Sequence, residues 1–320
     1  MLTVYPDYYA AFSCLMGACR HSCCKGWEID VDEVSLARYK ATDGDLGRRL
    51  SDAISYDGDP HFILAEDERC PFLNEEGLCE MILARGEEML CDICREHPRF
   101  HNALPGRLES GLGATCEAAA RLILGRKEPL SLVGAVSPSG DEIIDLRDEI
   151  LLVVTDRSRS LSERVSEMLS LAGATVARRS NAEWADLLLS LERLDGAWTE
   201  YLERLREIPG ELYGFHSSEE HEIEYEQILS YFVYRYLASS ECDLDVAENA
   251  ALAAFSLGLL LLVAEDAELD FDGRVELFRL YSSEIEYSEE NLAELKAALL
   301  SERDDTESEL RIKNTKEIKT

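Results

Sequence analysis

The residues of this sequence best suited to chemistry are its cysteines. Nine of the ten lie between positions 14 and 116 of the 320-residue chain, and only Cys242 falls outside that stretch. Because disulfides are rare in a reducing cytoplasm, thiols clustered in this way are more typical of metal ligands than of cross-links. They predict thiolate coordination of zinc or of an iron–sulfur cluster. Their spacing is Cys14-x4-Cys19-x3-Cys23-Cys24, then Cys70-x8-Cys79, Cys91-x2-Cys94 and Cys116.

Some of these spacings also predict how thiols are brought together. In Cys91-Asp-Ile-Cys94 the short turn between the cysteines aims both sulfurs at one metal. The segment Cys70–Cys79 has apolar residues on either side of Asn-Glu-Glu-Gly, which predicts a short hairpin with two thiolates at its base. Adjacent side chains point in different directions, so Cys23 and Cys24 are expected to serve different partners or different atoms of one cluster.

Spacing alone does not select the metal. Nine thiols suffice for two zinc sites of four ligands each, or for one iron–sulfur cluster with the remaining thiols in other structural or redox roles. A metal that only stabilises an irregular region with little apolar core is an equal alternative to a reactive centre.

The elements that must position these thiols differ between the two halves of the chain. Residues 1–128 are rich in cysteine, glycine and proline, which predicts a small irregular metal-binding domain. The stretch 128–140 is typical of a linker or surface loop. Residues 129–300 have helical periodicity and predict an all-α domain, and residues 301–320 form a polar tail that we expect to be frayed. The predicted fold class is therefore mainly α.

Start signals and apolar stripes locate the helices of the second half. Capping-box spacing occurs at Ser160–Glu163 and at Ser180–Glu183, and one amphipathic stripe runs from Trp184 to Leu205. Aromatic residues on the later stripes are expected in the core and at its rim rather than in a substrate groove. Those later stripes cover 223–236, 250–264, 275–281 and 288–299.

Charge and hydropathy exclude two classes of partner. Asp and Glu number 65 against 32 Lys and Arg, a net charge of −33 that repels nucleic acid and anionic membranes. Two explanations of this acidity are equally favoured: it keeps the protein soluble, or it attracts a basic, lysine-bearing partner. The apolar run 250–264 is shorter than the roughly 20 residues of a membrane span, and the first residues lack signal-peptide features. We therefore expect a cytoplasmic protein that binds neither nucleic acid nor membrane.

Several sequence blocks within residues 5–125 resemble the flagellin lysine-N-methylases, a family within a wider set of cysteine-cluster proteins associated with zinc or iron chelation. The blocks occur in the order found in that family, although the usual Tyr-Pro-Arg is His97-Pro98-Arg99 here. They are Tyr8-x3-Phe12-x-Cys14-x4-Cys19-x3-Cys23-Cys24-x2-Trp27, Arg69-Cys70-Pro71-Phe72-Leu73-Asn74-Glu75-x-Gly77-Leu78-Cys79, Leu90-Cys91-x2-Cys94-x2-His97-Pro98-Arg99 and Thr115-Cys116-Glu117-Ala118-Ala119.

The resemblance implies S-adenosylmethionine-dependent methylation of flagellin lysines in the cytoplasm, together with dependence on a cysteine-bound iron–sulfur cluster of the 4Fe-4S type, with zinc as the alternative metal. It does not identify a catalytic residue or a residue that binds S-adenosylmethionine. The cysteines that match the family blocks, and so are the candidate metal ligands, are Cys14, Cys19, Cys23, Cys24, Cys70, Cys79, Cys91, Cys94 and Cys116.

The sequence meets the requirements of this chemistry only in part. A lysine amine is nucleophilic only when neutral, so a site must desolvate it or accept its proton. The glycine-rich turn of ordinary nucleotide-binding methyltransferases is absent, and so is the C-x3-C-x2-C triad of radical S-adenosylmethionine enzymes. We therefore expect any S-adenosylmethionine to bind at an open iron of the cluster, which a change in the cluster's electron paramagnetic resonance spectrum on addition of S-adenosylmethionine tests.

Two other functions stay open: a metal-stabilised module that binds a protein without chemistry, and an iron–sulfur redox sensor without methyl transfer. Among the remaining polar residues, His21 and His97 are expected to be surface or hydrogen-bonded imidazoles rather than ligands. Arg99 and Arg121 are expected to pair with nearby glutamates, Glu96 or Glu117.

Overall fold

The computed structural model describes residues 2–212 and 221–300, and within them most residues are helical. The helices are α1 (Glu33–Lys40), α2 (Gly44–Asp52), α3 (Glu80–Arg85), α4 (Asp92–Glu96), α5 (Glu117–Leu124), α6 (Glu142–Val154), α7 (Leu161–Leu171), α8 (Asn181–Ser190), α9 (Gly196–Glu207), α10 (Glu222–Tyr236), α11 (Asp243–Asp266), α12 (Phe271–Tyr281) and α13 (Glu289–Leu299). Single turns are η1 (Tyr9–Ala11), η2 (Met16–Ala18), η3 (Glu87–Met89) and η4 (Leu237–Ser239), and η5 (Ser282–Glu286) is a π-helix. The strands are β1 (Leu2–Pro6), β2 (Ile54–Ser55), β3 (His61–Phe62), β4 (Arg99–Leu104), β5 (Arg107–Leu112) and β6 (Leu132–Val133).

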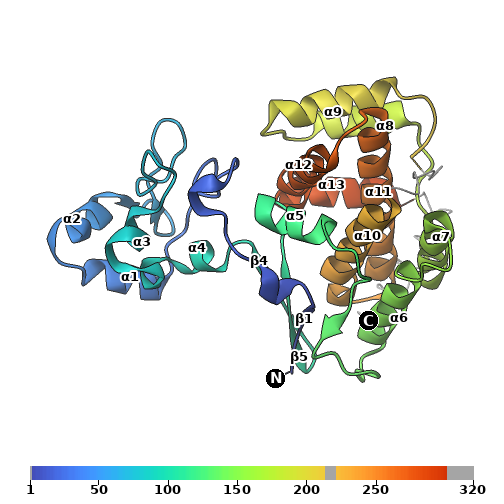
Figure 1. Cartoon of the computed structure of the whole chain (residues 1–320), viewed down its shortest axis with the longest axis horizontal. Coiled ribbons are helices and arrows are strands. Elements are labelled where there is room, and N and C mark those ends of the chain that lie inside the picture. The colour runs from blue at the N-terminus through green and yellow to red at the C-terminus, as the bar shows by residue number, and fades with distance from the viewer. Residues whose placement is uncertain (1, 213–220, 301–320) are drawn as a thin grey trace, which may run out of the picture.

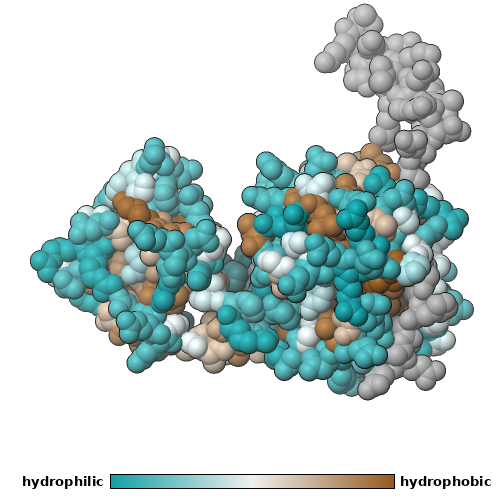
Figure 2. Space-filling model, turned by 90° about the horizontal axis from the view of Figure 1, so that it is seen from above, coloured by the Kyte–Doolittle hydropathy of each residue, from teal (hydrophilic) through white to brown (hydrophobic). Residues whose placement is uncertain are grey.

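The described residues form two separate hydrophobic cores. The small core is built from α1 to α4 and the loops between them, and the large core from α5 to α13. Figure 1 shows the corresponding small and large parts, with the chain passing from α4 into β4 where they join. In Figure 2 the two parts meet over a narrow waist, and their surface is largely hydrophilic with scattered hydrophobic patches.

A four-stranded sheet in the order β4-β5-β1-β6 lies against the large core. Strand β1 pairs parallel with β5 and antiparallel with β6, and β4 and β5 form an antiparallel hairpin. The hydroxyl of Tyr234 on α10 donates to the carbonyls of Val4 and Ser110, which fixes the helix to the sheet. The first strand of the cysteine-rich half therefore packs with the large part rather than the small one.

The helix-start signals read from the sequence are confirmed. Ser160 and Ser180 each form a complete capping box, with side chain and backbone bonds to Glu163 and Glu183. The predicted single stripe from Trp184 to Leu205 is wrong in one respect, because the structure divides it into α8 and α9. The chain is extended at Leu191, the residue that ends α8, and Asp195 then caps α9 through the N–H of Ala197.

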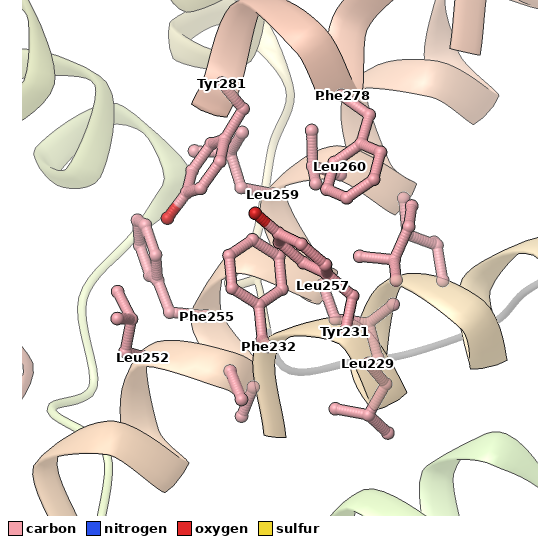
Figure 3. Packing of buried hydrophobic residues seen from close by; sticks show 14 of the residues in the cluster. Leu229, Tyr231, Phe232, Leu252, Phe255, Leu257, Leu259, Leu260, Phe278 and Tyr281 are labelled. Atoms are coloured by element: carbon pink, nitrogen blue, oxygen red, sulfur yellow. The ribbon is translucent and has the colours of Figure 1, made fainter. Parts of the chain in front are cut away.

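Helix α11 is the centre of the large core. Among the described helices it is the one long and apolar enough to span a membrane, but 89% of its most apolar stretch is buried inside the structure. Its Phe255 lies in the aromatic cluster of Figure 3 with Phe232, Phe278 and Tyr281. The Tyr281 hydroxyl lies 2.6 Å from the Ser256 hydroxyl, so the polar group buried among these rings is satisfied. The expectation that the aromatic stripe of α10 belongs to the core is confirmed.

The prediction of a mainly α chain is confirmed. Within 129–300 the structure adds one two-residue strand, β6, at the stretch expected to be a linker. The predicted domain division at residue 128 stays a prediction, as does the metal-binding nature of the first half. The predicted polar tail at 301–320 lies outside the described residues.

Candidate metal centre

The turn between Cys70 and Cys79 forms as the sequence predicts. Leu73 and Cys79 make an antiparallel bridge, and the Asn74 side chain accepts hydrogen bonds from the backbone N–H of Glu76 and Leu78. The guanidinium of Arg69 donates to the Leu73 and Asn74 carbonyls from the other side. These bonds hold the turn whose two ends carry thiols, one buried and one half-buried.

Helix α4 carries the second pair of thiols, at its N-cap and in its first turn. A hydrogen bond between the two thiols lowers the pKa of Cys91 and raises that of Cys94. The start of the helix is fixed by Asp32, whose carboxylate accepts from the N–H of Asp92 at 2.9 Å and from the N–H of Ser35. Burial disfavours the charge of Asp32, but these backbone donors outweigh it and lower its pKa to about 2.

The adjacent cysteines occupy different environments. Cys24 is half-buried against the small core, and its carbonyl accepts from the N–H of Cys70 at 2.8 Å. Cys23 is exposed, and its carbonyl accepts from the indole N–H of Trp27. A hydrogen bond from Cys23 and one from Ser22 lower the pKa of Cys24 to about 7, although burial opposes ionisation. The expectation that these neighbours serve different partners or different atoms of one cluster stays a prediction.

Cys14 and Cys19 flank the short turn η2, which packs on the Cys70–Cys79 turn. The contact is close because residue 17 is glycine: a Cβ at Gly17 would lie 2.7 Å from the backbone oxygen of Glu76. The thiol of Cys19 lies 3.8 Å from Glu117 Oε2 and 3.2 Å from the carbonyl of His21. The first cysteines of the chain are therefore placed between the small core and the start of α5.

Cys116 is the N-cap residue of α5 and packs against the large core. The next residue, Glu117, is buried and accepts from the Arg20 backbone N–H at 3.0 Å and from its guanidinium at 2.9 Å. This pair ties the segment that contains Cys19 to the helix that begins after Cys116.

The nine cysteines thus fall into two sets. The core set lies in or against the small core and consists of Cys24, Cys70, Cys79, Cys91 and Cys94. The junction set lies where that core meets α5 and consists of Cys14, Cys19, Cys23 and Cys116.

Electrostatic coupling between the thiols follows the same division. Burial raises the pKa of Cys70 to about 12, and the charges of Cys24, Cys79 and Cys91 add to the rise. In the junction set, burial raises the pKa of Cys19 and of Cys116, and Cys14 adds to both. The adjacent pair at 23–24 is the link between the sets.

The donor chemistry of both sets fits a metal that prefers thiolates, because every member contributes sulfur and thiols of the same set influence one another's ionisation. Within the described ranges 2–212 and 221–300, no three His, Cys, Asp or Glu side chains are already arranged to hold an ion.

The structure places the other sequence candidates as follows. His97 is part-buried beside Trp27, and His21 Nε2 lies 3.1 Å from Glu276 Oε2; that neither is a metal ligand stays a prediction. The expected glutamate pairing of the arginines is wrong. Arg121 pairs with Asp272 at 2.8 Å, because Glu117 is already occupied. The cation of Arg99 lies over the rings of Tyr9 and Phe12.

The sequence pattern did not indicate one charged group that lies near the junction set. The guanidinium of Arg235 is enclosed by four aromatic rings and pairs with Glu286 at 3.1 Å. The Tyr231 hydroxyl accepts from Arg235 and from the N–H of Ala114, and so connects this group to the loop before Cys116. The rings are Phe100, Tyr231, Tyr236 and Tyr287.

Comparisons with known proteins converge on one family. A family model for the FliB lysine N-methylase C-terminal domain matches residues 145–310, the half in which the sequence resemblance was weakest. The lysine-N-methylases of Salmonella typhimurium (strain LT2) and Salmonella choleraesuis (strain SC-B67) are 26% and 27% identical over 141 residues, which cover 40% of this chain and 33% of theirs. The flagellar biosynthetic protein FliU of Salmonella muenchen is 28% identical over 165 residues, 49% of this chain and 93% of that protein.

The matching region thus spans about a third of the length of the first two curated relatives. No solved structure matches the chain.

Proposed function

This chain belongs to the FliB lysine N-methylase family, and on that premise we propose that it transfers methyl groups from S-adenosylmethionine to lysine side chains of flagellin in the cytoplasm. The observation that carries the proposal is the family match over residues 145–310, just over half of the chain. The ordered cysteine blocks of the first half support it independently.

The transfer requires a neutral lysine amine. The amine lone pair forms the new N–C bond, the C–S bond of the sulfonium breaks, and the displaced electron pair stays on sulfur as S-adenosylhomocysteine. One proton leaves the nitrogen. A lysine at the surface is protonated at neutral pH, so the site must desolvate it or accept that proton. The net charge of −33 favours the approach of a lysine-bearing protein.

The proposal includes a cysteine-bound iron–sulfur cluster, with zinc as the alternative metal. Such a cluster would supply the position at which S-adenosylmethionine binds, and the sequence shows no glycine-rich nucleotide turn that would do so instead. The residues that would hold a metal are the cysteines of the core and junction sets. The chain's own part is to place these thiols: the Asn74 turn, α4 and the start of α5 do so.

The test begins with anaerobic purification and measurement of iron, acid-labile sulfide and zinc per chain. The metal-loaded protein is then incubated with flagellin and methyl-labelled S-adenosylmethionine, and methylated lysines are located by mass spectrometry. We expect label on flagellin lysines from the wild type and from Cys242→Ser, whose exposed thiol belongs to neither set. Flagellin with acetylated lysines is the matched control substrate.

Three results would contradict the proposal. Tight flagellin binding without transfer by a metal-loaded sample would favour a metal-stabilised binding module. A cluster that changes oxidation state reversibly, again without transfer, would favour a redox sensor. Zinc with no sulfide, together with no transfer, would make the cysteines a purely structural metal site.

A further inference from the structure

We propose that the nine cysteines build two separate thiolate metal centres, a structural centre in the core set and a reactive centre in the junction set. The division into two centres stands on the arrangement of the thiols alone. The reactive role of the junction centre rests on the proposed function, because methyl transfer is assigned to that centre.

The core set has the surroundings of a structural site. Cys70 and Cys91 are among the fully buried residues of the small core, and the other three thiols pack directly against it. Each pair is presented by a rigid local element, the bridged turn for Cys70 and Cys79 and a single helical turn for Cys91 and Cys94. Thiols presented in this way by rigid elements beside a core would suit a metal that stabilises the fold.

The small core also needs such a centre. It contains eleven fully buried residues, of which two are cysteines. Helix α1 is anchored directly to the segment before the second thiol pair, since the Tyr39 hydroxyl donates to the Met89 carbonyl at 2.7 Å. Regions of this size rarely fold on apolar burial alone and commonly depend on a bound metal.

The junction set has the opposite properties. Cys14 and Cys23 are exposed, and Cys19 and Cys116 are partly exposed. Its members come from two distant parts of the chain, residues 14–23 and the cap of α5, so that only the meeting of the small part with the large part assembles it. A centre at this position is accessible to a protein substrate.

Contacts around the junction set also connect it to both parts. Gly17 lies against the Cys70–Cys79 turn, and Glu117 holds Arg20 beside Cys19. The hydroxyl of Tyr287, which is 48% exposed, lies where a Cβ on Gly113 would be, and the Gly113 carbonyl accepts from the N–H of Cys116 at 3.4 Å. A partly exposed aromatic side chain of the helical part therefore lies against the loop that leads into Cys116.

Residues 23 and 24 mark the boundary between the two sets. Cys23 is exposed and Cys24 packs on the small core, and the hydrogen bond between their thiols is the contact at which the sets meet. A single centre bound by all nine cysteines would require their side chains to converge on one place. Two centres use four thiols of the junction set and the thiols of the core set.

The experiment compares single substitutions in each set with the full chain purified anaerobically. Cys14→Ser and Cys116→Ser test the junction set, Cys79→Ser and Cys94→Ser the core set, and Cys242→Ser is the control. Iron, sulfide and zinc are measured per chain, and thermal unfolding is followed by circular dichroism. We expect junction variants to keep the metal of the core centre, roughly half of the total if the two centres are alike, with little change in the unfolding of the small part.

Variants of the core set are expected to lose the metal of the core centre and to unfold at a lower temperature. Elemental analysis distinguishes zinc from an iron–sulfur cluster at each centre. If every variant of both sets loses all metal, or if the variants of one set lose none, the two-centre proposal is wrong. Cys14 is exposed, so its substitution preserves the fold and the test stands even if core variants precipitate.

These readouts do not depend on methyl transfer. A chain with two separable metal contents and no methylase activity would contradict the proposed function alone. An active chain with a single metal content would contradict the two-centre proposal alone.

Discussion

At the scale of single residues, the titration of His97 predicts how the stability of the folded protein changes at acid pH. Burial lowers its pKa from 6.5 to about 4 in the folded chain. Between these values the unfolded chain binds the extra proton and the folded chain does not, so stability falls as the pH is lowered from 6.5 towards 4. His97→Phe keeps a ring beside Trp27, whose centroid lies 6.0 Å away, and removes the titration.

We therefore expect the urea midpoint of His97→Phe to fall less steeply than that of the wild type over this pH interval. His61→Gln, a substitution on the surface of the small part, is the control. Protonation of the cysteine thiolates affects all three proteins alike and cancels in the comparison. Parallel pH profiles for wild type and His97→Phe would show that this imidazole does not limit acid stability.

The sequence was sufficient to predict thiol pairs that are local in the chain, but not their division into sets. Cys91 and Cys94 lie one helical turn apart, which short-range geometry dictates. Cys116 joins Cys14 and Cys19 only because α5 packs at the junction of the two parts. The pairing of Glu117 with Arg20 is equally non-local, so the nearby Arg121 was the wrong partner to predict.

At the scale of elements, the packing of η2 on the Cys70–Cys79 turn depends on the missing side chain of Gly17. A methyl group there would meet backbone rather than a flexible side chain, since its Cβ would be 2.7 Å from the Glu76 carbonyl oxygen. We expect Gly17→Ala to displace the segment 14–19, to lower junction-set metal as Cys14→Ser does, and to speed alkylation of Cys14 and Cys19 in the metal-free protein.

Gly196→Ala is the matched control, because a Cβ at that position has no neighbour within 4 Å. Quantitative mass spectrometry of alkylated peptides measures the rates. Unchanged alkylation and metal content in Gly17→Ala would mean that η2 reaches its position without this contact.

Helices were the elements best predicted from sequence, and the reason is that their signals are local. Ser160, Ser180 and Ser288 each cap the helix that follows them. The break at Leu191 was missed because the apolar spacing continues across it, and α9 starts only where Asp195 caps it. Strand β1 was missed because its partner β5 lies about a hundred residues further along the chain.

At the scale of the whole molecule, two cores joined at a narrow waist predict that unfolding is not a single transition (Figures 1 and 2). The large core has α11 at its centre, whereas the small core includes thiols among its buried residues. Between the parts lie the ion pair of exposed Arg20 with buried Glu117 and the contact of His21 with Glu276. The buried apolar residues of the two parts form separate clusters, so we expect the two cores to unfold separately.

Removing the metal should therefore unfold the small part and leave the helical part folded. After treatment with a chelator under anaerobic conditions, we expect hydrogen exchange of α1 to α4 to reach the rate of an unfolded chain, while α10 to α12 stay protected. The reason is that metal binding free energy is folding free energy for a core this small, whereas α11 is buried by apolar contacts that no metal supplies. Loss of protection in both parts at the same chelator concentration would show instead that the junction thiols hold the two cores together as one folding unit.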